Sequence, residues 1–452
     1  MIHEFADADG LAMAQDFASG RSDPVTALEA AIQRLPCAAH AFITVTEQRA
    51  QREALASRAR WQANAPLSEL DGVPIAWKDL FDLVDTPTTA GAALHRNAAH
   101  ARCDAALVNR LAQAGMVSVG KTNLSELAYS GLGLNPHFGT PANPEPAHAG
   151  RVPGGSSAGS AIAVAAGVVP IAMGTDTAGS IRIPAAFNGL VGYRSSRKRY
   201  CDSGVFGLAR SLDALGPLTR SVRDAVALDR VLVGGAALAP QDVRGLHLRV
   251  DEATLADPRV EPAVRDNLES CLQVLGAAGA WVDRRPVLAW QAALDSIAND
   301  GWLGASEAFA RHEHLLDSAQ AEQLDPRVRR RLEAARSLPA STQLRLYDRR
   351  VHLQNQLAAE LDGALLVTPS VAHVAPLLAP LEADDALFAS INLATLRLTM
   401  PGSLLDMPGI TLPSGHDGAG LPTGLLVSAP SGQDIQVLRA ALAIEELLKR
   451  RP

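Results

Sequence analysis

Apolar and polar positions along the chain predict strands and helices in alternation. Segments with apolar residues at helical spacing are separated by short apolar runs of the kind that form buried strands. This alternation predicts an α/β sheet with helices on both faces. We expect helices at 23–35, 47–64, 104–114, 157–167, 221–232 and 434–450. We expect strands at 41–45, 72–78, 116–119, 168–173, 363–369, 408–413 and 423–429.

Residues 235–360 differ from the segments on either side of them. They are helical in pattern, charged and poor in motifs, which predicts a variable insertion or a peripheral cover. The late strand signals complete the same sheet, so we predict one domain over 1–452. Its core covers about 20–232 and 362–452.

Composition argues against nucleic acid and membrane as partners. The 452 residues carry a net charge of −7 without a basic block, whereas phosphate binding needs clustered Lys and Arg. The one local basic cluster, Arg194, Arg197, Lys198 and Arg199, fits a solvated loop face. The longest apolar run, 161–173, is too short to span a bilayer.

Cysteine and histidine usage indicates a reducing compartment and no metal site or cofactor. The four cysteines, Cys37, Cys103, Cys201 and Cys271, form no CxxC pair and suit the cytoplasm. The first seven residues lack the charged-then-apolar pattern of a signal peptide. The segment 312–314, His-Glu-His, lacks the i, i+4 spacing that places two ligands on one helix face, and is expected to be a solvated helix face.

Two familiar motifs occur in the wrong context. Residues 115–122 match the phosphate-binding pattern G-x-x-x-x-G-K-T, but a helix precedes Gly115 and the residues between the glycines are strand-like. Residues 155–159 match G-x-S-x-G with Ser157 as nucleophile. That elbow requires a strand before it, and Pro153 makes one unfavourable.

Three other segments carry internal detail that a simple turn would not need. They are the Gly/Ser loop 154–160, the segment 174–185, and the Ile-Ala-Trp-Lys-Asp-Leu-Phe-Asp segment 75–82. Together they closely resemble the amidase signature family. Similarity continues at 120–127, 204–206, 211–217 and 421–425 and fades across 235–360. It implies the amidase signature fold, a large mixed β-sheet flanked by helices.

The resemblance implies a role for each matching residue. Ser180 falls on the nucleophile, Lys78 on the general base, and Ser156 on the bridging serine, which follows a cis peptide bond. The backbone N–H groups of Thr177, Ala178, Gly179 and Ser180 fall on the oxyanion hole. The chemistry is consistent, because a buried lysine without a counter-charge has a lowered pKa and can take a proton from a serine.

The resemblance also implies an amidohydrolase that forms an acyl-enzyme on Ser180 and releases ammonia or an amine. Its substrate is a small-molecule amide, for which a small or anionic compound is one hypothesis. Tyr129, Arg182 and Arg210 are the candidate substrate-binding residues, since an arginine fork suits a carboxylate. The alternative is that each arginine pairs with a nearby acid such as Asp176 or Asp213.

The sequence departs from the family pattern at two places. Ala178 stands where a glycine is common, so the backbone there must avoid a glycine-only conformation. The segment 193–196 replaces the Leu-Lys-Pro-Thr that is usual in the family, so the resemblance does not predict the shape of the loop near 193–203. The alternative function is the glutaminase subunit of a tRNA-dependent amidotransferase, against which the poor match at 235–360 argues. A homodimer is also considered.

Overall fold

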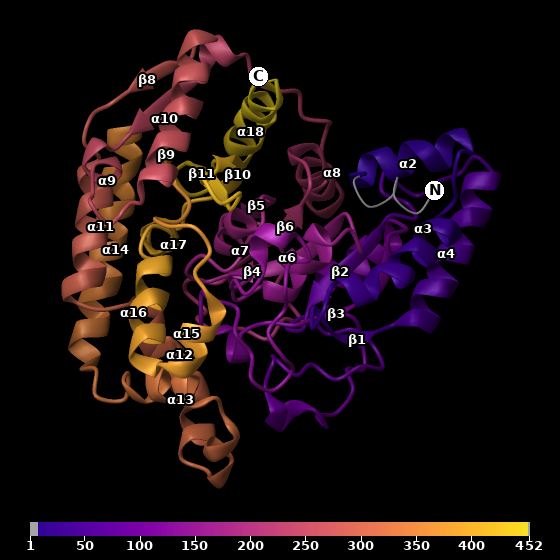
Figure 1. Cartoon of the computed structure of the whole chain (residues 1–452), viewed down its shortest axis with the longest axis horizontal. Coiled ribbons are helices and arrows are strands. Elements are labelled where there is room, and N and C mark those ends of the chain that lie inside the picture. The colour runs from indigo at the N-terminus through magenta and orange to yellow at the C-terminus, as the bar shows by residue number, and fades with distance from the viewer. Residues whose placement is uncertain (1–7, 451–452) are drawn as a thin grey trace.

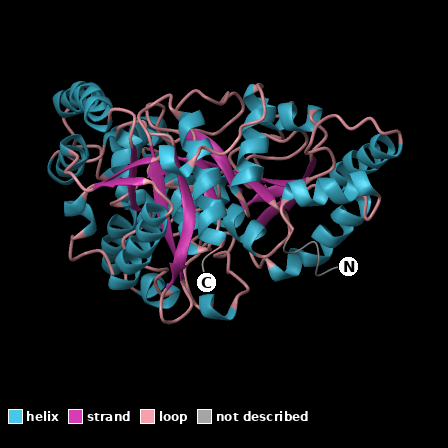
Figure 2. Ribbon diagram, turned by 90° about the horizontal axis from the view of Figure 1, so that it is seen from above, coloured by secondary structure: helices cyan, strands magenta, loops and turns pink. Residues whose placement is uncertain are grey.

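Successive residues of the central strands face two different hydrophobic cores. In the computed structural model, which describes residues 8–450, Ile75 and Trp77 pack into one core while Ala76 packs into the other. Met173 and Ala172 divide between the same two cores. Strands that are apolar on both faces require cover on both faces, and helices supply it. Figure 2 shows the sheet between its helices.

One mixed sheet of eleven strands runs through the described part of the chain. The order is β1-β3-β2-β4-β6-β5-β10-β11-β9-β7-β8. Parallel pairs join β3 to β2, β2 to β4, β9 to β7 and β7 to β8, and the other neighbours are antiparallel. The strands are β1 Phe42–Val45, β2 Pro74–Lys78, β3 Val117–Thr122, β4 Ile171–Asp176, β5 Val191–Arg194, β6 Ala214–Thr219, β7 His247–Val250, β8 Trp281–Asp283, β9 Leu365–Pro369, β10 Gly409–His416 and β11 Pro422–Ser428.

In Figure 1 the first helices of the chain lie at the right, helices from the middle of the chain lie at the far left, and the last helices lie between these two groups. The early helices are α2 Gly10–Ser19, α3 Pro24–Arg34, α4 Glu47–Gln62, α5 Ala106–Gln113, α6 Ala158–Ala165, α7 Arg182–Phe187 and α8 Val222–Val233. The middle helices are α9 Glu252–Leu255, α10 Pro262–Ala277, α11 Leu288–Asn299, α12 Leu303–Leu316, α13 Pro326–Glu333 and α14 Ala340–Leu361. The late helices are α15 Leu378–Ala383, α16 Asp385–Leu396, α17 Met400–Leu404 and α18 Asp434–Lys449.

The predicted elements of the signature region and the C-terminus are confirmed to within a few residues. The fold class is confirmed as well: an α/β protein with a large mixed sheet between helices. The expected helix at 23–35 is α3, which begins after Asp23; the Asp23 carboxylate accepts hydrogen bonds from the N–H groups of Val25 and Thr26. That the chain forms a single domain stays a prediction, and the expected absence of a leader concerns residues outside the described range.

The pattern missed β6, which lies in the middle of the sheet. Its sequence, Ala-Leu-Gly-Pro-Leu-Thr, contains Pro217, and proline argues against an interior strand because it donates no ladder hydrogen bond. Toward β5, however, only Leu218 and Thr219 are paired. Pro217 therefore pairs with Met173 of β4 on one side and lies beyond the end of the ladder on the other.

The region 235–360 contributes to the sheet, which the sequence pattern did not predict. β7 pairs with β9, and β8 pairs with β7, so two short parallel strands extend the sheet at one edge. They have four and three residues, too few for a recognisable period. Helices α9 to α14 account for most of the rest, as predicted.

Two expectations of solvent exposure were wrong. Arg194 is fully buried, and its guanidinium donates to the carbonyl groups of Met407 and Leu212. His312 is also buried and stacks on Phe206, and burial lowers the pKa of its imidazole to about 4. Within residues 8–450, no helix is both long and apolar enough to cross a membrane.

Candidate active site

Lys78 lies at the carboxyl end of β2 with its ammonium group enclosed. Its Nζ donates to the Ser156 hydroxyl at 2.7 Å and to the Thr175 hydroxyl at 2.9 Å. Burial lowers the pKa of Lys78 to about 7, although the carboxylates of Asp176 and Asp213 act in the opposite direction. A substantial fraction of Lys78 is therefore neutral near pH 7, as a general base must be.

Ser156 belongs to the loop that leads into α6. The peptide bond between Gly155 and Ser156 is cis, as the family resemblance implied. The Ser156 side chain is fully buried, and the next residue, Ser157, donates its N–H to the carbonyl oxygen of Ser180 at 3.2 Å. This backbone contact holds the loop of Ser156 against the turn that carries Ser180.

Ser180 follows β4 in a turn organised by Asp176. The Asp176 carboxylate accepts hydrogen bonds from the N–H groups of Gly179 at 2.8 Å and Ile181 at 3.1 Å. Burial opposes its ionisation, but Arg182 and Arg194 lower the pKa of Asp176 to about 2. An ionised carboxylate inside the turn therefore fixes the backbone on both sides of Ser180.

The turn provides free N–H groups at some of the expected oxyanion positions. Within residues 8–450, the N–H groups of Thr177, Ala178 and Ser180 donate to no acceptor. The N–H of Gly179 is different, because it is bound to Asp176. Gly179 has φ +138°, and a Cβ there would lie 2.2 Å from the Thr399 hydroxyl, so only glycine fits. Ala178 is not among the residues of positive φ and is accommodated without strain.

Arg182 forms an ion pair with Asp176, which was the alternative to a role in substrate binding. Its guanidinium contacts Asp176 through Nε at 3.0 Å and Nη2 at 2.8 Å, and Nη2 also donates to the Ser403 hydroxyl. The side chain is 1% exposed. The structure therefore gives Arg182 the task of holding the turn and leaves it no face for a substrate.

Arg210 is not brought to the turn. It is exposed and lines neither of the cavities that touch this turn. Asp213, the acid considered as its partner, instead accepts hydrogen bonds from the Thr177 hydroxyl and the N–H groups of Leu208 and Ala209. Within residues 8–450, the Arg210 side chain therefore neither lines a cavity at this turn nor pairs with Asp213, so the structure supports neither the predicted role of Arg210 nor its alternative.

Tyr129 and Ser180 line one small cavity. Two residues of the 235–360 region, Arg331 of α13 and Trp302 just before α12, line it too. The Arg331 guanidinium lies over the Tyr129 ring, 4.4 Å from its centroid, and Nη1 donates to the Tyr129 carbonyl at 2.8 Å. Its remaining N–H groups carry no bond to other residues within 8–450. A cation thus forms part of the wall around Ser180.

The two misleading motifs are explained by the structure. The Ser157 hydroxyl is buried and donates to the Thr175 carbonyl at 3.3 Å, so it is unsuited to attack. Lys121, in the phosphate-loop pattern, lies within β3 and forms a buried ion pair with Asp79 at 2.5 Å. Among residues 8–450, no group of three or more His, Cys, Asp or Glu could hold a metal ion.

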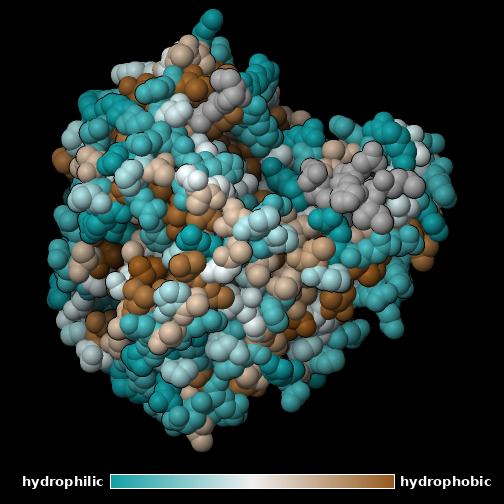
Figure 3. Space-filling view, viewed as in Figure 1, coloured by the Kyte–Doolittle hydropathy of each residue, from teal (hydrophilic) through white to brown (hydrophobic). Residues whose placement is uncertain are grey.

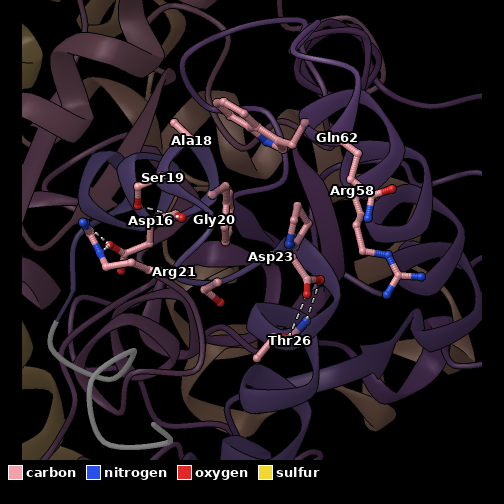
Figure 4. Close-up of a pocket in the computed structure, with 13 residues that line it drawn as sticks. Asp16, Ala18, Ser19, Gly20, Arg21, Asp23, Thr26, Arg58 and Gln62 are labelled. Carbon is pink, nitrogen blue, oxygen red and sulfur yellow. Dashed lines mark hydrogen bonds and ion pairs between the residues drawn. The ribbon is translucent and has the colours of Figure 1, made fainter.

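A larger hollow lies elsewhere. It has a volume of about 900 Å³ and lies between α2, α3 and α4, where Asp16, Arg21 and Arg58 are among its lining residues (Figure 4). Asp16 pairs with Arg21, and Asp23 caps α3. None of the predicted site residues lines it, so size alone does not identify the site.

Sequence reasoning missed three residues of the site. Thr175 stood inside the signature but was given no role, although its polar side chain directly before a buried acid was a usable signal. Arg331 is the last of three consecutive arginines at 329–331, a pattern typical of a solvated helix face. Trp302 stands in a connection between two helices, and its position carries no signal in the sequence.

Comparison with known proteins identifies the family to which this fold belongs. The Amidase family model matches residues 24–438, so the chain belongs to the amidase family. It is an amidohydrolase, a hydrolase of carbon–nitrogen amide bonds. The matched range runs through 235–360, where the resemblance had been expected to fade.

The individual relatives include both a deaminase and a subunit of an amidotransferase. The chain is 36% identical over 419 residues to 2-amino-5-chloromuconic acid deaminase of Comamonas testosteroni, covering 90% of this chain and 88% of that protein. It is 30% identical to a glutamyl-tRNA(Gln) amidotransferase subunit of Symbiobacterium thermophilum, covering 96% and 95%. A crystal structure of an amidase superposes with a TM-score of 0.85 at 32% identity, covering 97% of this chain and 99% of that one.

Proposed function

We propose that this amidohydrolase cleaves a small, carboxylate-bearing amide through an acyl-enzyme on Ser180. The observation that carries the proposal is the Lys78–Ser156 contact of 2.7 Å beneath a turn with free N–H groups. A buried amine of lowered pKa can accept a proton only if a hydroxyl lies within hydrogen-bond distance, and Ser156 does. Ser180 lines the cavity at this turn.

In the first half-reaction the Ser180 oxygen attacks the amide carbonyl carbon. Its proton passes to Ser156 while the Ser156 proton passes to neutral Lys78. The carbonyl oxygen becomes an oxyanion, which the N–H groups of Thr177, Ala178 and Ser180 bind. The proton then returns from Lys78 through Ser156 to the leaving nitrogen. The carbon–nitrogen bond breaks, and ammonia or an amine departs.

In the second half-reaction water replaces the amine. A water molecule attacks the ester carbonyl and gives a proton to Lys78 through Ser156. The bond to the Ser180 oxygen breaks, and that oxygen recovers the proton. The carboxylic acid leaves, and the site returns to its starting protonation state. Thr177, Ala178 and Ser180 again hold the oxyanion.

Arg331 supports a substrate with a carboxylate group. It replaces Arg182 and Arg210 in the hypothesis of an anionic amide, because it lines the same cavity as Ser180 and has N–H groups without a partner within residues 8–450. The relative from Comamonas testosteroni is a deaminase of 2-amino-5-chloromuconic acid, which agrees with an acidic substrate.

An amide panel tests the proposal. Ammonia release is measured from monoamides of dicarboxylic acids, from neutral amides of equal length and from glutamine. Mass spectrometry of quenched enzyme then seeks an acyl group on Ser180. Turnover of the monoamides with a modified Ser180 is expected. Turnover without any adduct, retained in Ser180→Ala, would contradict the mechanism.

The glutaminase subunit of a tRNA-dependent amidotransferase is the second candidate. Similarity to a protein of that kind extends over 96% of this chain, so the 235–360 region no longer argues against it. Expression with an affinity tag in the native cell separates the two. Glutaminase activity that depends on co-purifying subunits favours this candidate, and amide hydrolysis by the isolated chain favours the first.

We place the enzyme in the cytoplasm. Free thiols at Cys37, Cys103 and Cys201 are exposed and suit a reducing compartment. The homodimer stays a prediction, which sedimentation of the purified chain would test.

A further inference from the structure

The turn formed by residues 126–130 is part of the wall around Ser180. Residues 128–130 line the same small cavity as Ser180. Leu127 and Ala128 within the turn have φ values of +51° and +59°, which residues other than glycine rarely adopt. Residues keep such a conformation only where the surrounding contacts impose it. The contacts around the first residue of the turn therefore bear on the shape of the pocket.

That first residue, Glu126, is completely buried, and its carboxylate has two partners. One oxygen, Oε2, accepts a hydrogen bond from the N–H of Asp325 at 2.7 Å. The other oxygen, Oε1, lies 3.0 Å from Nε2 of His137. A buried donor that loses its acceptor is costly, because water does not take the place of the acceptor. The contact between Glu126 and Asp325 is therefore expensive to break.

Asp325 is the residue directly before α13. Its own carboxylate caps the helix by accepting a hydrogen bond from the N–H of Arg327 at 2.9 Å, while its N–H is bound by Glu126. Glu126 thus joins the turn to the start of a helix that begins about two hundred residues later in the chain.

The apolar face of α13 is small. Its eight residues bury Val328 and Leu332. Figure 3 shows mainly hydrophilic surface in the lower part of the molecule, where Figure 1 places α13. Arg330 pairs with Asp385 of α16, but both side chains are exposed, and such pairs contribute little. The buried contact with Glu126 is therefore a main determinant of where α13 lies.

The main chain of Glu126 holds the other side of the same wall. Its carbonyl oxygen accepts a hydrogen bond from the N–H of Tyr129 at 3.1 Å. Tyr129 is the residue over whose ring the Arg331 guanidinium lies, and Arg331 belongs to α13. Glu126 therefore binds Tyr129 through its backbone and the helix that carries Arg331 through its side chain.

We propose that Glu126 is a positioning residue, which holds α13 against the turn 126–130 and so sets the place of the Arg331 guanidinium relative to Ser180. The inference rests on the proposed function, in which Arg331 binds the carboxylate of the substrate. Glu126 does not itself line the cavity of Ser180, so it acts on the substrate through Arg331. It thereby affects the affinity for anionic amides and not the rate of the chemical step.

Hydrogen exchange followed by mass spectrometry tests the contact without any substrate. Glu126→Met removes the acceptor at a similar side-chain length, so amide exchange in the peptide that contains Asp325 and α13 should become about tenfold faster. Glu126→Gln is the matched control, because its amide oxygen can still accept from the N–H of Asp325. Exchange in that variant should stay near the wild-type rate.

A second pair of variants removes the donor, in case Glu126→Met does not fold. Asp325→Pro lacks the N–H, and proline suits the φ of −52° at this position. Leu324 before it is extended, with ψ 151°, as a residue before proline must be. Asp325→Ala also loses the capping carboxylate but keeps the N–H, so the difference between the two variants reports the contact with Glu126.

Kinetics test the consequence for binding. Glu126→Met and Asp325→Pro should each raise KM for a dicarboxylic monoamide about tenfold above their matched controls. Both kcat and KM for a neutral amide of equal length should change less than about threefold. In an Arg331→Met background, Glu126→Met should raise KM no further, because the two residues act through one contact.

Three results would overturn the proposal. They are unchanged exchange in α13 in both Glu126→Met and Asp325→Pro, an equal loss of activity on the anionic and neutral amides, and independent effects of Glu126→Met and Arg331→Met on KM. Failure of the proposed function is seen separately, as absence of ammonia release and of a Ser180 adduct in the wild-type enzyme. Hydrogen exchange still decides in that case whether Glu126 holds α13.

Discussion

The segment from β2 to β6 and the segment from α9 to α14 reach the same pocket by different means. The first supplies Lys78 from a strand end and Ser180 from a turn held by a buried acid, and a backbone hydrogen bond joins that turn to the loop of Ser156. The second supplies side chains from helices and a connection, Arg331 and Trp302. A strand end and a hydrogen-bonded turn hold the first group of residues, whereas a side chain at the cavity wall, such as Arg331, can be exchanged without moving them. On the proposed mechanism, the chemistry and the choice of substrate thus depend on separate parts of the chain.

The largest effect expected from this division is on Ser180. Ser180→Ala should lower kcat by about 10⁴- to 10⁶-fold, since it removes the oxygen that forms the acyl-enzyme in the proposed mechanism. Ser157→Ala is the control and should keep kcat within about tenfold, as it loses one hydrogen bond to Thr175. Steady-state ammonia release measures both. Comparable losses in the two variants would contradict the assignment of Ser180, and not Ser157, as the nucleophile.

Lys78 should set the pH dependence. With its pKa at about 7, the neutral amine is the minor form at lower pH, so kcat/KM should rise about tenfold per pH unit below 7 and level off above it. Lys78→Met should lose about 10²- to 10⁴-fold in rate together with this inflection. The exposed Lys198 provides the control, because Lys198→Met should leave the inflection in place. An inflection that survives in Lys78→Met assigns it to another group.

Arg331 should act on binding and not on chemistry. Arg331→Met should raise KM for a dicarboxylic monoamide by about ten- to a hundredfold, the value of a charge-assisted hydrogen bond, with little change in kcat. KM for a neutral amide should not rise. The control is Arg330→Met, one residue earlier, where the side chain is exposed and pairs with Asp385. A fall in kcat for both substrates would place Arg331 with the reacting groups and break the comparison.

Thr175 should give the smallest effect. Thr175→Val removes the hydroxyl that accepts from Lys78, and kcat/KM should fall about tenfold. The ammonium form loses more than the neutral amine does, so the inflection near pH 7 should move to lower pH. Thr175→Ser restores a hydroxyl and should restore both. If activity fell while the inflection of the pH profile stayed in place, Thr175 would contribute to packing and not to the pKa of Lys78.

The sequence predicted correctly those features that depend on residues close together in the chain. Strand ends, helix caps and the Gly/Ser loop can be recognised from neighbouring residues, and the predicted catalytic trio lies in segments whose pattern resembles the family. The position of Arg331 could not be predicted, because its contact with Tyr129 joins residues 202 apart in the chain. The N–H of Gly179 was expected to be free, but its bond to Asp176 depends on the exact path of the turn. Strand β6 was missed because Pro217 has no backbone N–H. That absence matters only where a neighbouring strand would accept the hydrogen bond, which the sequence does not reveal.

The buried triad of Asp176, Arg182 and Arg194 has a consequence for how this protein can diversify. Loss of Asp176 leaves the Arg182 guanidinium in the interior without its acidic partner, which is strongly destabilising. A lineage that exchanges Arg331 or Trp302 meets no such barrier, since both lie at a cavity wall. On the proposed function, mutations at these two positions can therefore alter which amides are accepted while the reaction is inherited unchanged.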